Sequence, residues 1–122
     1  MQKKIVIIDD DEGIRDIVKI IFEKAGYEVV ILMDPALLYA HQHCDASIIL
    51  LDKQLAGFDG IEVCKYLKKQ PQFKNIPVVL MSATNNICNL WQAAGADGFI
   101  EKPFSKKDLL QKIDHSLNRQ YA

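Results

Sequence analysis

The amino-acid sequence predicts an α/β fold in which a parallel sheet is covered by helices on both faces. Short apolar runs rich in β-branched residues alternate five times with stretches that have helical spacing. Two of these runs, Ile5–Ile8 and Ile48–Leu51, are apolar at every position, as expected of strands buried on both sides. Strand and helix alternation favours parallel pairing through right-handed crossovers, so the sequence predicts a doubly wound sandwich.

The five expected strands are the β-branched runs between turn-forming residues. They cover Ile5–Ile8, Glu28–Leu32, Ser47–Leu51, Val78–Met81 and Gly98–Ile100. The common order for five such strands is 2-1-3-4-5, the flavodoxin-like (βα)5 arrangement, in which the first and third strands are neighbours. Ligands of such folds bind outside the carboxyl ends of the strands, which is where functional residues are expected.

The first two helices are indicated by apolar spacing and by capping residues. One continuous stripe predicts the buried side of the first helix, with Gly26 as a left-handed C-terminal cap: Ile14, Ile17, Val18, Ile21 and Ala25. Asp34-Pro35 combines an N-cap with proline at the first helical position and opens a short second helix through about Gln42.

The remaining three helices follow the third, fourth and fifth strands. The third is expected from about Gly60 to Lys69, with Ile61, Cys64 and Leu67 buried. The fourth begins at Asn85 or Asn86, ends at Gly95, and has an inner stripe of Ile87, Leu90, Trp91 and Ala94. Ser105 and Asp108 resemble a capping box for the last helix, whose buried face is Leu109, Leu110, Ile113 and Leu117.

Length and composition predict one domain over residues 1–122 and exclude several classes of function. Of the 122 residues 49% are hydrophobic and 25% charged, and the formal charge is −1, which gives no overall electrostatic reason to bind nucleic acid or an anionic membrane. With no signal peptide or membrane span in the pattern, a cytoplasmic location is expected. The three cysteines form no CxxC, and His41 and His43 have poor ligand spacing, which argues against disulfides and zinc.

Four of the five predicted strands end in residues that can do chemistry. Asp9 and Asp10 follow the first strand, Asp52 the third, Ser82 the fourth and Lys102 the fifth. Each has an ordinary explanation alone, such as a solvated turn or a surface lysine. Because parallel strands end at one edge of the sheet, the fold is expected to gather all five residues in one crevice.

Three carboxylates in one crevice require positive charge nearby. Each pair repels by about 4 kcal/mol at 4 Å and an effective dielectric constant of 20, and Lys102 supplies one positive charge. Oxygen ligands that leave room for water and phosphate suit Mg²⁺, and such a site fits phosphoryl transfer to a carboxylate. The glycine-rich and nucleophile motifs of dinucleotide-binding proteins, P-loop enzymes and serine hydrolases are missing from the sequence.

Four motifs, in order, resemble the receiver domain of two-component response regulators, the CheY-like family. They lie at the ends of the predicted strands and span almost the whole chain: Ile5-Val6-Ile7-Ile8-Asp9-Asp10-Asp11, Leu50-Leu51-Asp52 with Gly57-Phe58-Asp59-Gly60, Met81-Ser82-Ala83, and Gly95-Ala96-Asp97-Gly98-Phe99-Ile100-Glu101-Lys102-Pro103-Phe104.

The resemblance implies a role for each matched site residue. Asp52 would accept a phosphoryl group from a phosphohistidine on a sensor histidine kinase or a histidine phosphotransfer protein. Mg²⁺ would be held by Asp9, Asp10, Asp52 and the backbone carbonyl of Gln54, with Asp10 the more direct of the acidic pair. Ser82 would move to the phosphoryl group, and Lys102 would pair with the acyl phosphate. Such a domain is not a classical enzyme, although it can catalyse its own phosphotransfer and dephosphorylation.

The resemblance also implies a conformational switch. Phe99 occupies the aromatic switch position, and Lys102-Pro103 is expected to be a cis peptide. Phosphorylation would bias two arrangements of the fourth helix, fifth strand and fifth helix, and so change the binding of a downstream protein. A homodimer is left open, and neither nucleic acid nor a membrane is an expected partner of this domain.

Three features depart from the usual family pattern. Ala56 stands where the loop after the acceptor usually has proline, and the stretch from Ser82 to Lys102 is a couple of residues shorter than is typical. The second departure falls on the predicted fourth helix and therefore on the expected output surface. The third is that Phe99 lacks a hydroxyl, so any switch there would work through packing alone. None of the three touches the acidic cluster.

Two alternative functions remain open from the sequence. One is a receiver-like interaction module that is never phosphorylated. The other is a phosphatase of the haloacid-dehalogenase type with Asp9 as nucleophile, although Asp9-Asp10-Asp11-Glu12-Gly13 does not match the DxDGT motif of that class. Phosphorylation of Asp52 would exclude the first, and turnover of phosphomonoesters would favour the second.

Overall fold

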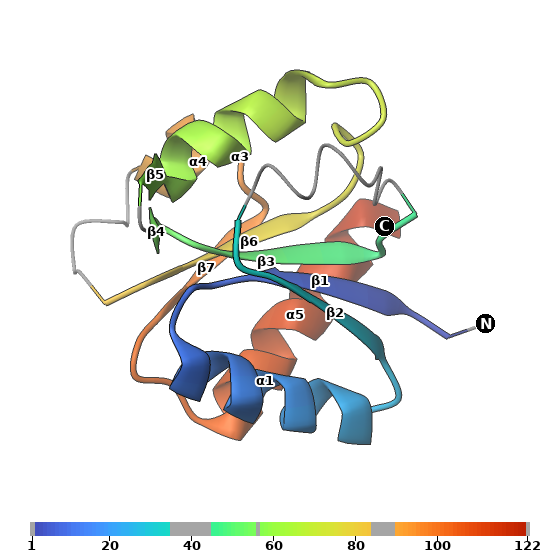
Figure 1. Ribbon diagram of the computed structural model, residues 1–122. Coiled ribbons are helices and arrows are strands. Elements are labelled where there is room, and N and C mark those ends of the chain that lie inside the picture. The colour runs from blue at the N-terminus through green and yellow to red at the C-terminus, as the bar shows by residue number, and fades with distance from the viewer. Residues whose placement is uncertain (1, 35–44, 56, 84–89, 122) are drawn as a thin grey trace.

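A computed structural model describes residues 2–34, 45–55, 57–83 and 90–121 as a three-layer α/β sandwich (Figure 1). The central parallel sheet has the order β2-β1-β3-β6-β7. Its strands are β1 (Lys4–Ile8), β2 (Glu28–Leu32), β3 (Ile48–Asp52), β6 (Val78–Ser82) and β7 (Gly98–Glu101). The predicted order is confirmed, and every predicted strand is present to within one residue at each end.

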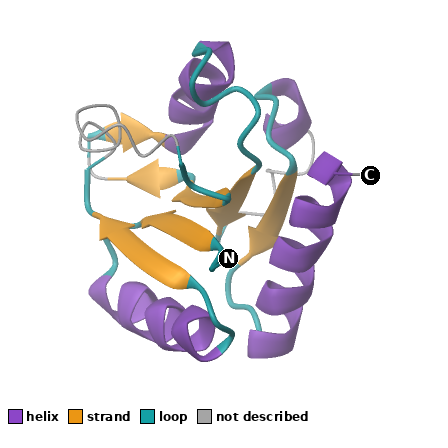
Figure 2. Cartoon of the chain, turned by 90° about the vertical axis from the view of Figure 1, so that its right-hand side faces the viewer, coloured by secondary structure: helices purple, strands orange, loops and turns teal. Residues whose placement is uncertain are grey.

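The helices cover both faces of the sheet. Helices α1 (Glu12–Lys24) and α5 (Lys106–Tyr121) lie on one face, and α3 (Gly60–Lys69) and α4 (Leu90–Ala93) lie on the other (Figures 1 and 2). The predicted second helix, the start of the predicted fourth helix and the residues His41, His43, Cys44 and Cys88 lie outside the described residues.

The two inward faces of the sheet form two apolar clusters. Ile5 and Ile7 point toward α1 and α5, whereas Val6 and Ile8 point toward α3, as the alternation of side chains along a strand requires. All four side chains are fully buried, as are Ile48 to Leu51 of β3. The prediction of strands covered on both faces is therefore confirmed.

Helix α1 buries most of its predicted stripe but is turned slightly from it. Val18 and Ile21 are buried and Ile14 is half-buried, as predicted, whereas Ile17 is 55% exposed and Ala25 is also exposed. Phe22, which the prediction omitted, is fully buried. Phe22 meets Tyr27 edge to face with ring centroids 5.2 Å apart. Burying this large ring removes more apolar surface from water than burying Ile17, so the helix is turned to face Phe22 inward.

The caps and buried faces of the other helices agree with the sequence. Gly26 and Gly95 both adopt positive φ angles, 94° and 83°, after α1 and α4. Ser105 Oγ accepts a hydrogen bond from the Asp108 N–H at 3.0 Å. The predicted inner residues of α3 and α5 are buried, except that Leu110 is half-buried: Ile61, Cys64, Leu67, Leu109, Ile113 and Leu117.

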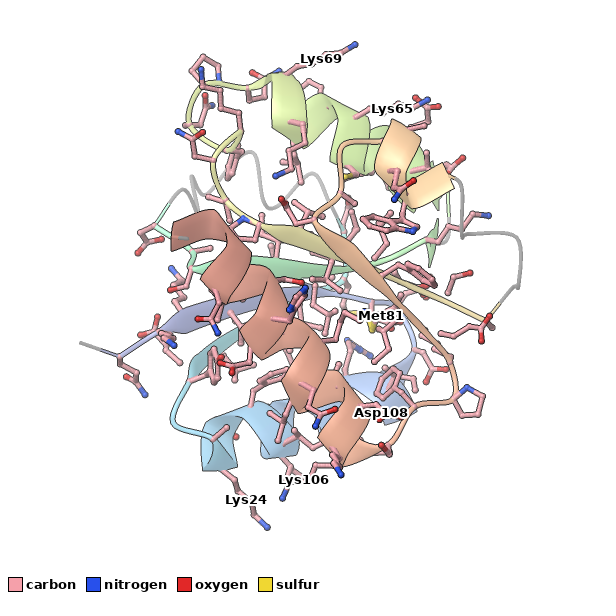
Figure 3. All side chains as sticks on the ribbon, turned by 180° about the vertical axis from the view of Figure 1, so that it is seen from behind. Lys24, Lys65, Lys69, Met81, Lys106 and Asp108 are labelled. Carbon is pink, nitrogen blue, oxygen red and sulfur yellow. The ribbon has the colours of Figure 1, made fainter. Side chains whose placement is uncertain are left out.

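Charged side chains cover the outside of this core. Figure 3 shows Lys24, Lys69 and Lys106 extending outward from the helices, whereas Met81 of β6 is enclosed between the sheet and α5. None of the helices among the described residues combines the length and apolar character that a membrane crossing requires.

Candidate functional site

The carboxyl edge of the sheet brings together the chemical residues predicted from the sequence. Asp9 directly follows β1, Asp52 and Ser82 end β3 and β6, and Lys102 directly follows β7. The register sets Asp52 beside Met81 and Ser82 beside Glu101. The ends of four strands thus carry the site on a rigid support.

Lys102 joins the two buried carboxylates of the site. Its Nζ lies 3.1 Å from Asp9 Oδ2 and 3.4 Å from Asp52 Oδ2. The side chain of Asp9 is fully buried, that of Asp52 is 10% exposed and that of Lys102 is 16% exposed. Two carboxylates this far from water require a countercharge, and Lys102 provides it.

Asp9 has both carboxylate oxygens engaged by the protein itself. Oδ1 accepts the Asp11 backbone N–H at 2.8 Å, and Oδ2 accepts from Lys102 at 3.1 Å. Asp11 in turn caps α1, because its Oδ1 accepts the N–H of Ile14 at 3.2 Å. Asp9 is therefore built into the start of α1, with its side chain fully buried.

Asp10 completes a set of carboxylates that fits a divalent cation. Asp9, Asp10 and Asp52 each offer one oxygen, and these oxygens lie within 4.8 Å of one another. Asp10 is exposed, while Asp9 and Asp52 are buried, so the set opens to solvent on the Asp10 side. Oxygen donors that keep one open side match the preference of Mg²⁺, which retains several waters when bound.

Electrostatics at the site keep Lys102 charged. Burial by itself lowers the pKa of a lysine, but the neighbouring charges of Asp52 and Asp9 outweigh this effect, and the pKa of Lys102 lies above its ordinary value. Three carboxylates and one ammonium leave the cluster with a net negative charge, which a divalent cation would neutralise.

Ser82 is buried at the end of β6, and its backbone is tied to Lys102. The Lys102 N–H donates to the Ser82 carbonyl at 2.8 Å, while the Lys53 N–H donates to the Met81 carbonyl, also at 2.8 Å. The residues that follow β3 and β7 are thus connected by backbone hydrogen bonds to the last two residues of β6. The Lys102–Pro103 peptide is cis, as the resemblance implied.

The loop after Asp52 folds into a small antiparallel pair that the sequence did not predict. Strands β4 (Gln54–Leu55) and β5 (Phe58–Asp59) pair in the register Gln54 with Asp59 and Leu55 with Phe58. Gln54, whose carbonyl is a predicted Mg²⁺ ligand, therefore lies on a paired strand two residues after Asp52. Ala56, the departure from the family pattern, lies outside the described residues.

Phe99 contacts the helices on both sides of β7. Its ring centroid lies 5.5 Å from that of Trp91 on α4, and Lys112 Nζ of α5 lies 5.9 Å from the Phe99 centroid. Lys112 Cδ also lies over Gly98, 3.5 Å from where a Cβ would be. Because Gly98 and Phe99 face opposite sides of the sheet, the Lys112 side chain passes around the outer edge of β7. Trp91 is half-buried against the core, as predicted.

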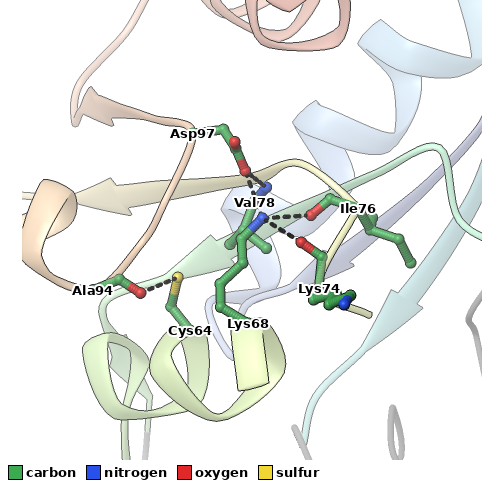
Figure 4. A network of polar contacts seen from close by, with 7 residues as sticks. All are labelled: Cys64, Lys68, Lys74, Ile76, Val78, Ala94 and Asp97. Carbon is green, nitrogen blue, oxygen red and sulfur yellow. Dashed lines mark hydrogen bonds and ion pairs between the residues drawn. The ribbon is translucent and has the colours of Figure 1, made fainter. Parts of the chain in front are cut away.

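An ion pair at the amino ends of the strands was not predicted from the sequence. Lys68 Nζ lies 2.8 Å from Asp97 Oδ2 and donates to the Ile76 carbonyl at 2.8 Å (Figure 4). Asp97 Oδ2 also accepts the Val78 N–H at 2.9 Å. This network fastens the end of α3 to the starts of β6 and β7.

One pocket lies away from the acidic cluster. About 520 Å³ of space lies between the end of α1, the residues before β1 and α5, lined by Lys3, Gly26, Tyr27 and Asp114 among others. Burial raises the pKa of Tyr27, and Asp114 adds to the effect. The acidic cluster lies at the other end of the sheet and is open to solvent on the Asp10 side.

The order of acids, serine and lysine along these strand ends is matched by one family model. The model for the response regulator receiver domain matches residues 5–114. The chain belongs to the response regulator receiver domain family. Receiver domains are signalling domains of two-component systems rather than classical enzymes, and the acidic cluster of this receiver domain could bind Mg²⁺.

Solved structures of response regulators agree with this assignment. A CheY-like receiver domain protein from Methanospirillum hungatei is 31% identical, with a TM-score of 0.88 over 99% of this chain and 98% of that one. The chemotaxis response regulator CheY4 of Vibrio cholerae is 27% identical, with a TM-score of 0.87 over 95% and 99%. NtrX from Brucella abortus is 31% identical with a TM-score of 0.86, and this receiver domain matches 28% of its length.

Proposed function

We propose that this receiver domain, over residues 1–122, is reversibly phosphorylated on Asp52 by a phosphohistidine donor in a Mg²⁺-dependent reaction. The donor is a sensor histidine kinase or a histidine phosphotransfer protein in the cytoplasm. One observation carries the proposal. The Lys102 ammonium lies between Asp52 and Asp9, with the Asp10 carboxylate close enough to share a cation with both.

The proposed reaction moves one phosphoryl group between two side chains. An Asp52 carboxylate oxygen attacks phosphorus, the P–N bond of the donor breaks, and its electron pair stays on the departing imidazole. Lys102 offsets the negative charge on the phosphoryl oxygens, and the Ser82 hydroxyl donates a hydrogen bond to one of them. When bound by Asp9, Asp10, Asp52 and the Gln54 carbonyl, Mg²⁺ supplies further charge neutralisation and orientation.

The phosphorylated state is proposed to bind a downstream protein through α4, β7 and α5. Ser82 and Lys102 are linked through backbone hydrogen bonding between β6 and β7, and Phe99 lies on β7 three residues before Lys102. Because Phe99 contacts Trp91 on α4 and Lys112 on α5, a movement of this ring changes both helices at once. Phe99 has no hydroxyl, so this coupling works through packing.

The decisive experiment compares Asp52→Asn with the wild type. Acetyl phosphate or a phosphorylated donor should label the wild type in the presence of Mg²⁺, and the variant should remain unlabelled. Asp114→Asn is the matched control, because this exposed carboxylate lies near the opposite end of the sheet. Undiminished labelling of Asp52→Asn at another residue would contradict the proposal.

The interaction module that is never phosphorylated has no comparable support. Such a module would have no need for the Lys102 ammonium between two buried carboxylates, or for the exposed Asp10 carboxylate beside them. Titration with Mg²⁺ while following Trp91 fluorescence provides a rapid comparison of the two functions. The dehalogenase hypothesis requires Asp9 as nucleophile, but the Asp9 side chain is fully buried and the chain belongs to the receiver family.

A further inference from the structure

The first residue of α3 lies directly against the backbone of the proposed phosphoacceptor. After Asp52 the chain forms the β4–β5 pair and returns at Gly60, whose N–H donates to the Lys53 carbonyl at 2.6 Å. Asp59 Oδ1 accepts the N–H of Ile61 at 2.9 Å and caps the helix at the same point. The start of α3 is therefore held by hydrogen bonding against the end of β3.

This contact leaves no space for a side chain on Gly60. A Cβ there would overlap the carbonyl oxygen of Asp52 and would come within 2.7 Å of Lys53 Cα. Both atoms belong to the backbone, and that backbone is held in turn. Asp52 is paired in register with Met81, and the Lys53 N–H donates to the Met81 carbonyl at 2.8 Å. Relief of the clash therefore requires movement of the end of β3 or of α3.

A displacement at this point would move the carboxylate. The Asp52 side chain and the obstructing carbonyl belong to the same residue, and Asp52 Oδ2 lies 3.4 Å from Lys102 Nζ. Mg²⁺ demands near-ideal ligand geometry, and a misplacement of about 1 Å can slow a reaction about 100-fold. Small shifts of the backbone are thus expected to have large effects at the site.

We propose that Gly60 is a positioning residue for Asp52. By allowing α3 to begin in contact with the Asp52 backbone, it fixes the carboxylate and the following loop, including Gln54, relative to Asp9, Asp10 and Lys102. The expected effect of Gly60 on phosphorylation rests on the proposed function. The expected effect of Gly60 on cation binding does not, because cation binding can be measured without a phosphodonor.

The first test is Gly60→Ala. Folded variant protein should bind Mg²⁺ about tenfold or more weakly than the wild type, and its initial rate of labelling by acetyl phosphate should fall about 10- to 100-fold. Both values are taken per folded molecule, with the folded fraction measured by circular dichroism and urea unfolding. Wild-type affinity and labelling in folded Gly60→Ala would overturn the inference.

Gly98→Ala is the matched control. A Cβ at Gly98 would lie 2.9 Å from Ser116 Oγ, so this glycine is also crowded, but it stands at the start of β7, away from the acids. The obstructing atom is the end of a side chain that can rotate. We expect some loss of stability with unchanged Mg²⁺ affinity and unchanged labelling. Equal losses at the site in both variants would attribute the effect to general strain and overturn the inference.

A second pair of variants covers failure of Gly60→Ala to fold. Asp59→Ala removes the exposed carboxylate that caps α3 and loosens the same contact without adding atoms. It should weaken Mg²⁺ binding and labelling, and Asp59→Asn, which keeps the accepting oxygen, should restore most of both. Wild-type behaviour of Asp59→Ala would overturn the inference. If the wild type is not labelled, the proposed function is refuted, and the Mg²⁺ titrations still decide the role of Gly60. If the wild type does not bind Mg²⁺, both the proposed function and the role of Gly60 are overturned.

Discussion

Lys102 and Asp9 are separated by 93 positions in the sequence, yet their side chains meet at 3.1 Å. The same ammonium lies 3.4 Å from Asp52, so one lysine serves a structural carboxylate and the proposed acceptor. Removal of the Lys102 side chain should therefore change both the stability of the fold and the rate of phosphorylation, whereas the carboxylates that would bind the cation remain.

We expect Lys102→Ala to slow phosphorylation of Asp52 about tenfold or more, because a charge that stabilises the transferring phosphoryl group is lost. Mg²⁺ binding should persist, since its carboxylate ligands remain. Labelling rates and Mg²⁺ titrations measure the two effects. The control is Lys106→Ala, an exposed lysine at the start of α5. An unchanged labelling rate in Lys102→Ala would remove the assigned role.

The raised pKa of Lys102 predicts a loss of stability at high pH. Burial opposes the charge, but Asp52 and Asp9 raise the folded pKa above the ordinary value of 10.5. The contribution of Lys102 is therefore fully present below about pH 10.5 and is lost as the pH rises through the folded value. The difference in the free energy of unfolding between wild type and Lys102→Met should shrink above this pH. A difference that grows there would contradict the assignment.

The Cys64 thiol is expected to be unreactive. Burial raises the pKa of Cys64 to about 12, although Lys68 partly opposes the shift, and Sγ lies 3.6 Å from the Ala94 carbonyl. In a variant with Cys44→Ser and Cys88→Ser, alkylation at pH 8 should be at least about 1000-fold slower in the folded than in the unfolded protein. Rapid modification of the folded variant would show that Cys64 is accessible.

The Lys68–Asp97 network is expected to stabilise the fold without affecting the site. Asp97→Ala should lower the free energy of unfolding by about 2 kcal/mol, because the Val78 N–H and the Lys68 ammonium lose their shared acceptor. A double-mutant cycle with Lys68→Met should give a coupling energy of about 1 kcal/mol. Urea unfolding measures both values. Additive effects of the two changes would show that the ion pair contributes nothing.

Much of the fold follows from local sequence patterns. Apolar β-branched runs predict the five main strands, and their alternation with helices predicts parallel pairing, because each pattern depends on neighbouring residues. The strand order was predicted as the common one for five such strands, and it is confirmed. The rotation of α1 was harder to predict. Its sequence offers two overlapping apolar sides, and only packing against the sheet selects Phe22 over Ile17. The β4–β5 pair was missed because two-residue strands have no periodicity.

The site residues could be predicted because parallel strands end at a common edge. Asp9, Asp10, Asp52, Ser82 and Lys102 were placed there by chain position alone, and their roles remain proposals. The contact between Lys68 and Asp97, the contact at Gly60 and the contact of Lys112 with Phe99 were not predicted. Each depends on how neighbouring elements pack in three dimensions, and no spacing rule applies to such contacts.

The path of Lys112 around β7 also bears on how copies of this domain behave at high concentration. β7 is a terminal strand of the sheet, and terminal strands offer unpaired amides and carbonyls that can recruit a strand from another molecule. A charged lysine held beside Phe99 would have to be displaced and dehydrated before such recruitment. We therefore expect the same side chain that contacts the aromatic ring to oppose aggregation by sheet extension.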